Sequence, residues 1–201
     1  MEIEIAGRAA RILGAHNAIA EAVADALARN GATVAWGEAP GGNPAGDATP
    51  DILVLSHALA PDAAHRPDAL AASAEAVAAA MVARGSGRIV HLVSAAGLVP
   101  MRRHPTWSAA HAGAIAAMWG LAMASGPAVQ VNAVAVGRIE AADAGAATGD
   151  AAMLSHVPLG RAGNAEDVAN AVLFVDPLNS YTTGQSLAVD GGWTTGYGRN
   201  F

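Results

Sequence analysis

The chain has 201 residues, of which 53% are hydrophobic and only 4% aromatic, so it is long enough for one domain whose core is filled mainly by small aliphatic side chains. Its formal net charge of −6 argues against a nucleic-acid or anionic-membrane surface, because such partners need clustered Lys and Arg. The absence of cysteine excludes disulfides and thiolate chemistry. The acidic start MEIEI and the lack of a long apolar run predict one cytoplasmic domain over residues 1–201, without signal peptide or membrane span.

The first part of the chain predicts a strand–turn–helix–strand unit. A strand is expected from Arg8 to Leu13, a helix from about Asn17 to Arg29, and a second strand from Ala32 to Trp36. The turn between the first strand and the helix begins at Gly14, where a doubly wound fold binds a dinucleotide. Residues 37–50 are rich in Gly and Pro and predict a loop.

The rest of the chain alternates further strands and helices. Short β-branched and aliphatic runs predict strands, and Ala-rich stretches predict helices. The expected elements are strands at 51–56, 87–94 and 185–189, and helices at 67–84 and 106–125, with another helix beginning near Glu166 and Asp167. This pattern indicates an α/β protein with a doubly wound, Rossmann-like parallel sheet of about six strands.

The stretch from Gly87 to Met118 carries a specific resemblance. A strand ends at Ser94 in the sequence GRIVHLVSAAG, and a helix with the sequence WSAAHAGAIAAM follows it. This arrangement resembles the active-site segment of the short-chain dehydrogenase/reductase family, which has Ser-x-x-Gly and then Tyr-x-x-x-Lys on a helix. The family's Tyr falls on Trp107 and its Lys on His111, so the spacing is kept while two of three catalytic side chains are replaced.

The other family motifs match unevenly. The family's Gly-x-x-x-Gly-x-Gly cofactor turn falls on Gly14, Ala18 and Ala20, so only its first glycine is present, and Glu38 falls at the acidic position that would bind an adenosine ribose. The resemblance implies that a helix, a strand and a further helix are missing after the second strand. The segments 129–141, 158–175 and 180–192 resemble the family's C-terminal motifs closely.

These replacements favour a non-catalytic member of the family, because an indole has no proton that titrates usefully and a Cβ at Ala18 intrudes where a phosphate would sit. We therefore expect no cofactor and no metal. The resemblance implies assembly with an active homologue, or with itself, through the helices 67–84 and 106–125 and the C-terminal strand.

Two alternatives stay open. In the first, an enzyme on the same scaffold works without a nicotinamide, with Ser94 positioning a substrate oxygen and His111 or His57 moving a proton, and with His104 as a further candidate in the crevice. In the second, the chain is a divergent oxidoreductase that uses NAD or NADP.

Overall fold

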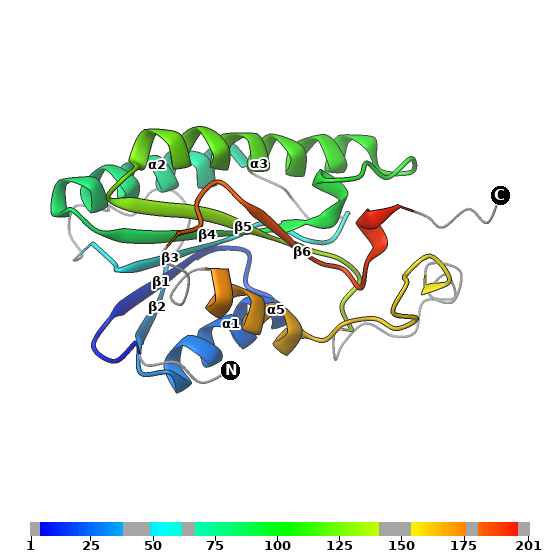
Figure 1. Ribbon diagram of the computed structural model, residues 1–201, viewed down its shortest axis with the longest axis horizontal. Helices are drawn as coiled ribbons and strands as arrows, with labels where there is room; N and C mark the ends of the chain where they lie inside the picture. The colour runs from blue at the N-terminus through cyan, green and yellow to red at the C-terminus, as the bar shows by residue number, and fades with distance from the viewer. Residues whose placement is uncertain (1–4, 38–48, 62–66, 141–153, 176–180, 197–201) are drawn as a thin grey trace.

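The computed structural model describes residues 5–37, 49–61, 67–140, 154–175 and 181–196. They form a six-stranded parallel sheet between two layers of helices (Figure 1). The strands are β1 (Ala9–Gly14), β2 (Thr33–Gly37), β3 (Ile52–Ser56), β4 (Gly87–Ser94), β5 (Val129–Val136) and β6 (Ser186–Val189). The helices are α1 (Ala18–Arg29), α2 (Pro67–Arg84), α3 (Pro105–Ser125) and α5 (Ala165–Leu173), with short 3-10 turns η1 (Ala95–Gly97) and η3 (Trp193–Thr195). The predicted fold class is confirmed.

The strand order β2-β1-β3-β4-β5-β6 reverses direction between β1 and β3. The chain leaves β1 on one side of the sheet to build β2, and it returns on the other side of β1 to build β3. At such a reversal the connections after neighbouring strands diverge, and a crevice opens at the carboxyl ends of the strands. This topology positions the candidate site described below.

Each face of the sheet packs against one pair of helices. Helices α1 and α5 cover one face, where side chains such as Ile12, Leu27 and Val172 form one buried cluster. Helices α2 and α3 cover the other face over a second cluster that includes Leu55 and Met118. Alternate residues of β3 and β4 point into the two clusters, as expected for strands buried on both faces.

Edge strand β2 is less well covered than the central strands. None of its five residues is fully buried, whereas all five residues of β3 are. This difference agrees with the expected loss of secondary structure after the second strand. The loop predicted at 37–50 lies mostly outside the described residues.

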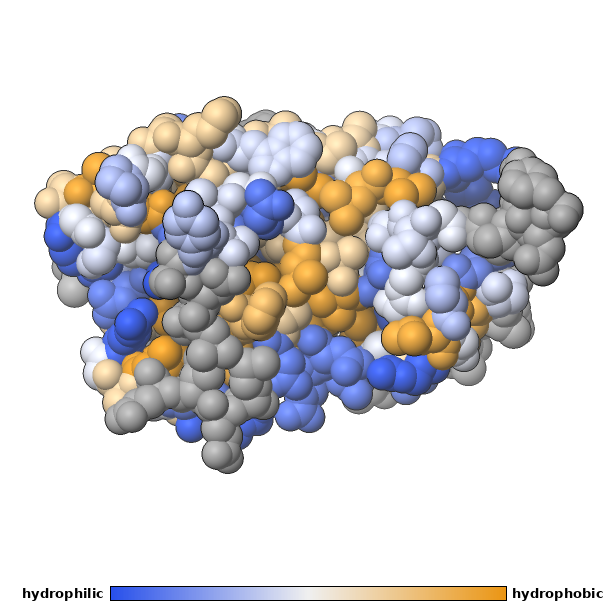
Figure 2. Space-filling model, in the orientation of Figure 1, coloured by the Kyte–Doolittle hydropathy of each residue, from blue (hydrophilic) through white to orange (hydrophobic). Residues whose placement is uncertain are grey.

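Helix α3 is apolar around its whole circumference. Its sequence between Pro105 and Ser125 contains no Asp, Glu, Lys or Arg, and its outer side exposes Trp119 and Met123. Figure 2 shows hydrophobic residues reaching the surface along the upper edge, over α2 and α3. No helix in the described ranges is both long enough and apolar enough to cross a membrane.

Candidate functional site

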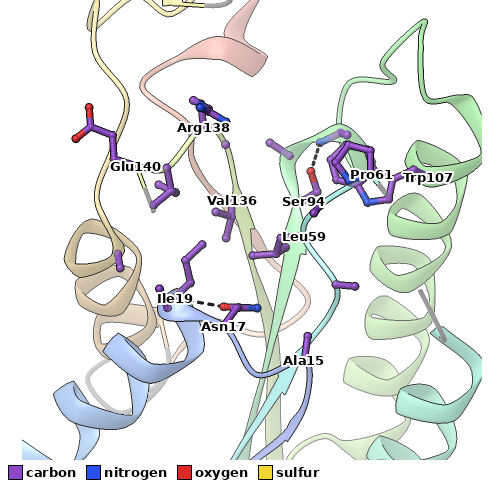
Figure 3. Close-up of a pocket in the computed structure, with 18 of the residues that line it drawn as sticks. Ala15, Asn17, Ile19, Leu59, Pro61, Ser94, Trp107, Val136, Arg138 and Glu140 are labelled. Atoms are coloured by element: carbon purple, nitrogen blue, oxygen red, sulfur yellow. Dashed lines mark hydrogen bonds between the residues drawn. The ribbon is translucent and has the colours of Figure 1, made fainter. Parts of the chain in front are cut away.

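A crevice of about 500 Å³ opens at the carboxyl edge of the sheet. Four adjacent strands contribute the segments at their carboxyl ends to its lining. These segments are residues 15–19 after β1, 58–61 after β3, 94–96 at the end of β4 and 136–140 at the end of β5. Figure 3 shows Asn17 and Ile19 on the α1 side, Ser94 and Trp107 on the α3 side, and Arg138 and Glu140 at the rim. The crevice therefore lies at the place where the strand order predicts a binding site.

Gly14 brings the first turn close to β3. Its φ angle of +105° is one that residues with a side chain rarely adopt, and a Cβ there would collide with the carbonyl oxygen of Ser56. The same carbonyl accepts a hydrogen bond from the backbone N–H of Ala15, at 2.7 Å. Gly14 thus fixes the floor of the crevice, and Ala18 lines its wall at the start of α1.

Asn17 caps α1 with its side chain. The carboxamide oxygen accepts from the backbone N–H groups of Ile19 and Ala20, at 3.1 and 3.0 Å (Figure 3). These are amides of the first turn, which otherwise have no partner within the helix. The carboxamide oxygen therefore satisfies donors that an anion at the helix start would use.

Ser94 lines the crevice at the end of β4. Its hydroxyl oxygen accepts a hydrogen bond from the backbone N–H of Ala96, at 3.2 Å (Figure 3). Its contact with His111 is made by the backbone instead, since the N–H of Ser94 donates to Nδ1 of His111 at 3.1 Å. This geometry does not favour Ser94 as a nucleophile activated by His111, which requires the hydroxyl to face the imidazole.

His111 lies behind the crevice wall. It is fully buried, and its Nε2 contacts the carbonyl oxygen of Ala58 at 3.1 Å. Because Nδ1 accepts from Ser94, the proton of the neutral ring must be on Nε2, which donates to Ala58. His111 therefore joins the end of β4 to the segment after β3, and it is not among the residues that line the crevice.

Trp107 lines the crevice at the position of the family's Tyr. Its indole ring packs edge-on against His111, with 5.0 Å between ring centroids. In the described structure its buried Nε1–H has no hydrogen-bond partner. An indole N–H donates a hydrogen bond but accepts none, so Trp107 can polarise an acceptor atom without taking up a proton.

The remaining predicted residues lie in different places. Ala20 is fully buried on the core face of α1 and does not line the crevice. His104 precedes α3 and packs edge-on against Trp107 at 6.3 Å between centroids. Glu38 lies outside the described residues.

His57 is buried with a histidine that sequence reasoning missed. Nε2 of His57 lies 3.3 Å from Nδ1 of His91 on β4, and the ring centroids of His57 and His111 are 6.2 Å apart. Burial lowers the pKa of His91 to about 4, so this ring is neutral at pH 7. His91 could have been recognised from the sequence, because it is a histidine inside an otherwise aliphatic part of a strand. In the described ranges no group of three or more His, Asp or Glu residues could hold a metal ion.

Sequence reasoning also missed four polar residues at the crevice. His16 and Asn17 belong to the first turn, and Arg138 and Glu140 follow β5. The turn was compared with the family's cofactor turn only at its glycine positions, so His16 and Asn17, which lie between those positions, were not considered. Arg138 directly follows Gly137 in the segment 129–141 that resembles a C-terminal motif of the family. A basic side chain at this position could have indicated an anion-binding residue.

Residues 62–194 match the family model described as Enoyl-(Acyl carrier protein) reductase. Among curated proteins, 3-oxoacyl-[acyl-carrier-protein] reductase of Synechocystis sp. is 38% identical over 121 residues, which is 59% of this chain. The match covers only 49% of that relative's length.

Solved structures match over nearly the whole chain. A putative 2-deoxy-d-gluconate 3-dehydrogenase from Agrobacterium tumefaciens with bound NADP has a TM-score of 0.75 at 27% identity, covering 96% of this chain and 98% of that one. A putative NAD(P)-dependent gluconate 5-dehydrogenase from Beutenbergia cavernae, also with bound NADP, has a TM-score of 0.75 at 28% identity, with 96% and 99% covered.

The bound NADP in these two similar structures contradicts the prediction that the chain takes no cofactor. That prediction gave the Cβ atoms of Ala18 and Ala20 too much weight. Ala20 points into the core, and Ala18 leaves a crevice of about 500 Å³ open beside it. With a family model matching residues 62–194 and a parallel-sheet fold that matches a solved dehydrogenase structure at a TM-score of 0.75, the chain belongs to the short-chain dehydrogenase/reductase family of oxidoreductases.

Proposed function

We propose that this chain binds a nicotinamide dinucleotide in the crevice but lacks the residues that move the proton in its relatives, so that it serves as a non-catalytic subunit. The observation that carries the proposal is the burial of His111 and the hydrogen bonding of both its ring nitrogens. The family's Lys position is held here by a fully buried imidazole with both nitrogens bonded to backbone groups. Such a ring can stiffen the crevice wall, but it offers no free charge to a reacting group.

The residues around the crevice fit a dinucleotide. The start of α1 contributes the positive end of a helix dipole, and Arg138 adds a cationic side chain at the rim. Small residues such as Ala15, Ala18 and Ala58 let a ligand approach the backbone closely. A bound nicotinamide would supply hydride transfer. The chain's own part is to hold the phosphates at α1 and Arg138 and to place a substrate oxygen near the Ser94 hydroxyl.

The side chains at the family's Tyr and Lys positions, Trp107 and His111, are not suited to proton transfer to a substrate in the crevice. A phenol can donate and accept a proton, whereas the indole N–H of Trp107 only donates a hydrogen bond. The Ser94 hydroxyl already accepts from Ala96 and has no titratable partner at its oxygen. These two side chains can bind a carbonyl oxygen, and neither can protonate it at a useful rate near neutral pH.

The outer side of α2 and α3 supports a subunit role. A helix that is apolar all round is normally buried, yet α3 exposes about half of Trp119 and most of Met123. Gly113 and Gly120 lie in the same helix with open space where a Cβ would be, although a glycine inside a helix costs roughly 1 kcal/mol relative to alanine. We infer that another helix packs closely here, from a second copy of the chain or from an active homologue.

The test combines binding and turnover. We expect NADPH or NADH to quench intrinsic Trp fluorescence saturably, and we expect no oxidation of the nucleotide with a panel of ketones. Ala18→Leu places a larger side chain on the crevice wall and should abolish binding, while Ala28→Leu on the exposed side of the same helix should not. Absence of binding would refute the proposal, and nucleotide oxidation with a ketone would identify a divergent oxidoreductase instead.

A further inference from the structure

Helices α2 and α3 pack side by side over one face of the sheet and leave a groove of about 370 Å³ between them (Figure 1). Four alanines form much of its lining, together with Glu75 of α2, Gly120 and Leu121 of α3, and His91 of β4. Glu75 and Gly120 are exposed, so the groove opens to the outside of the helix layer. It shares no described lining residue with the crevice at the carboxyl edge of the sheet and is therefore a separate site.

His91 forms the floor of this groove. On β4 it lies on the same face of the sheet as Ile89 and Val93, which belong to the core cluster under α2 and α3. The residue is only 2% exposed, and its Nδ1 lies 3.3 Å from Nε2 of His57. In the part of the chain that the structure describes, Nε2 of His91 has no hydrogen-bond partner. A buried polar atom without a partner is unfavourable, so a molecule that bonds to Nε2 gains by satisfying it.

We propose that the groove binds a small, uncharged apolar molecule with one hydroxyl group, of the class of the phenols, whose hydroxyl forms a hydrogen bond with Nε2 of His91. The inference goes beyond the proposed function, because the groove lies apart from the crevice that would hold a dinucleotide. The space is sufficient, since an apolar cavity of about 150 Å³ can hold benzene and this groove has about 370 Å³.

A hydroxyl suits His91 in both neutral forms of its ring. Burial lowers the pKa of His91 to about 4, so the ring is neutral at pH 7. If His57 donates from Nε2 to Nδ1 of His91, the proton of His91 is on Nε2 and donates to the oxygen of the bound molecule. If Nδ1 of His91 donates to His57, Nε2 has a lone pair and accepts from the hydroxyl. A carbonyl or ether oxygen only accepts, and it therefore fits just one of the two forms.

The lining disfavours ionised molecules. Alanine methyl groups and Leu121 offer an apolar body the contacts that it needs, and they offer a charge none. Among the described lining residues Glu75 is the one charged side chain, and its carboxylate repels an anion. A cation would find a counter-charge only at this exposed residue, where an ion pair contributes little compared with the loss of water around the cation.

The first experiment compares phenol with toluene, which has a methyl group in place of the hydroxyl. Isothermal titration calorimetry measures the Kd of each compound for the full chain and for His91→Leu. We expect the unmodified chain to bind both compounds, because the walls are apolar. In His91→Leu the affinity for phenol should fall about tenfold, as the loss of one hydrogen bond predicts, while the affinity for toluene changes less than about twofold.

Two glycines of α3 supply a second variant and its matched control. At both Gly113 and Gly120 a Cβ would meet nothing within 4 Å, but only Gly120 lines the groove. Gly120→Leu fills the groove with a side chain and should weaken phenol and toluene alike, by about tenfold or more. Gly113→Leu should change neither affinity. Both variants add the same side chain to the exposed part of α3, so an effect on packing against a partner helix would not separate them.

Three results would overturn the inference. The first is an unchanged affinity for phenol in His91→Leu or in Gly120→Leu, and the second is an equal loss of both compounds in His91→Leu. The third is that neither compound binds the unmodified chain, as expected if a side chain of a second copy fills the groove instead. NADPH binding is measured separately on the same samples, so a failure of this inference leaves the proposed function standing. Circular dichroism of each variant checks that it is folded.

Discussion

The buried side chain of His91 should make the protein less stable as the solution is acidified from pH 7 to pH 5. In the folded chain, burial lowers the pKa of His91 to about 4. In the unfolded chain the same imidazole has an ordinary pKa of about 6.5. Between these two values the unfolded state binds more protons than the folded state, so the free energy of unfolding falls as the pH falls.

The size of the effect follows from the two pKa values. Linkage gives a loss of about 2 kcal/mol between pH 7 and pH 5, with most of it below pH 6.5. Below about pH 4 both states bind the proton, and this residue adds no further loss. A loss of about 2 kcal/mol is a large part of the free energy of unfolding of an ordinary domain, which is about 5–15 kcal/mol.

The assay is urea unfolding followed by Trp fluorescence at pH 7, 6 and 5, on the unmodified chain and on His91→Gln. The variant loses the group that titrates, so its free energy of unfolding should depend less on pH by about 2 kcal/mol over this range. His156→Gln removes an exposed imidazole and serves as the control. Parallel pH profiles for the unmodified chain and His91→Gln would refute the reasoning, as would an NMR titration that places the pKa of His91 near 6.5.

Three further substitutions test the crevice. Asn17→Ala should lower the free energy of unfolding by about 1 kcal/mol in urea titrations because α1 loses its cap, and it should tighten NADPH binding by freeing the N–H of Ile19; weaker binding would contradict this role. His111→Leu should cost about 2 kcal/mol in the same titrations, since it leaves the buried N–H of Ser94 and the part-buried carbonyl of Ala58 without the imidazole, and a cost below 1 kcal/mol would show that the ring is not a structural link. Gly14→Ala should lower the thermal midpoint by about 10 °C, because its Cβ meets the Ser56 carbonyl at an unfavourable φ, and an unchanged midpoint by calorimetry would be incompatible with this turn.

The sequence predicted the sheet well because its signals are local. Strands such as β3 and β4 are short aliphatic runs, and α1 has its cap at Asn17 and its stop at Asn30-Gly31, so these elements were placed to within a residue or two. Glu166 and Asp167 indicated the start of α5 in the same way, and they lie in its first turn. The alternation of strands and helices then indicated a doubly wound parallel sheet of about six strands, and the structure supplied the strand order.

The site was harder because side-chain direction is not local. Spacing placed Ser94, Trp107 and His111 at one crevice, yet His111 points behind the wall to Ala58. Ala20 matched a cofactor position by number but packs into the core. Residue spacing predicts where a residue lies along a helix. Burial and hydrogen-bond partners, which the spacing does not give, decide whether its side chain faces the crevice or the core.

The proposed function requires that the crevice persist although Trp107 and His111 occupy the family's Tyr and Lys positions. The crevice is lined by the segments at the ends of β1, β3, β4 and β5, so its position depends on the strand order. His111 stabilises the same edge by joining Ser94 to Ala58. Replacing an amine by an imidazole at this position removes a charge and adds a structural link. Under the proposed function, the substitution at position 111 would therefore preserve the shape of the crevice while removing the charged group of the family's Lys position.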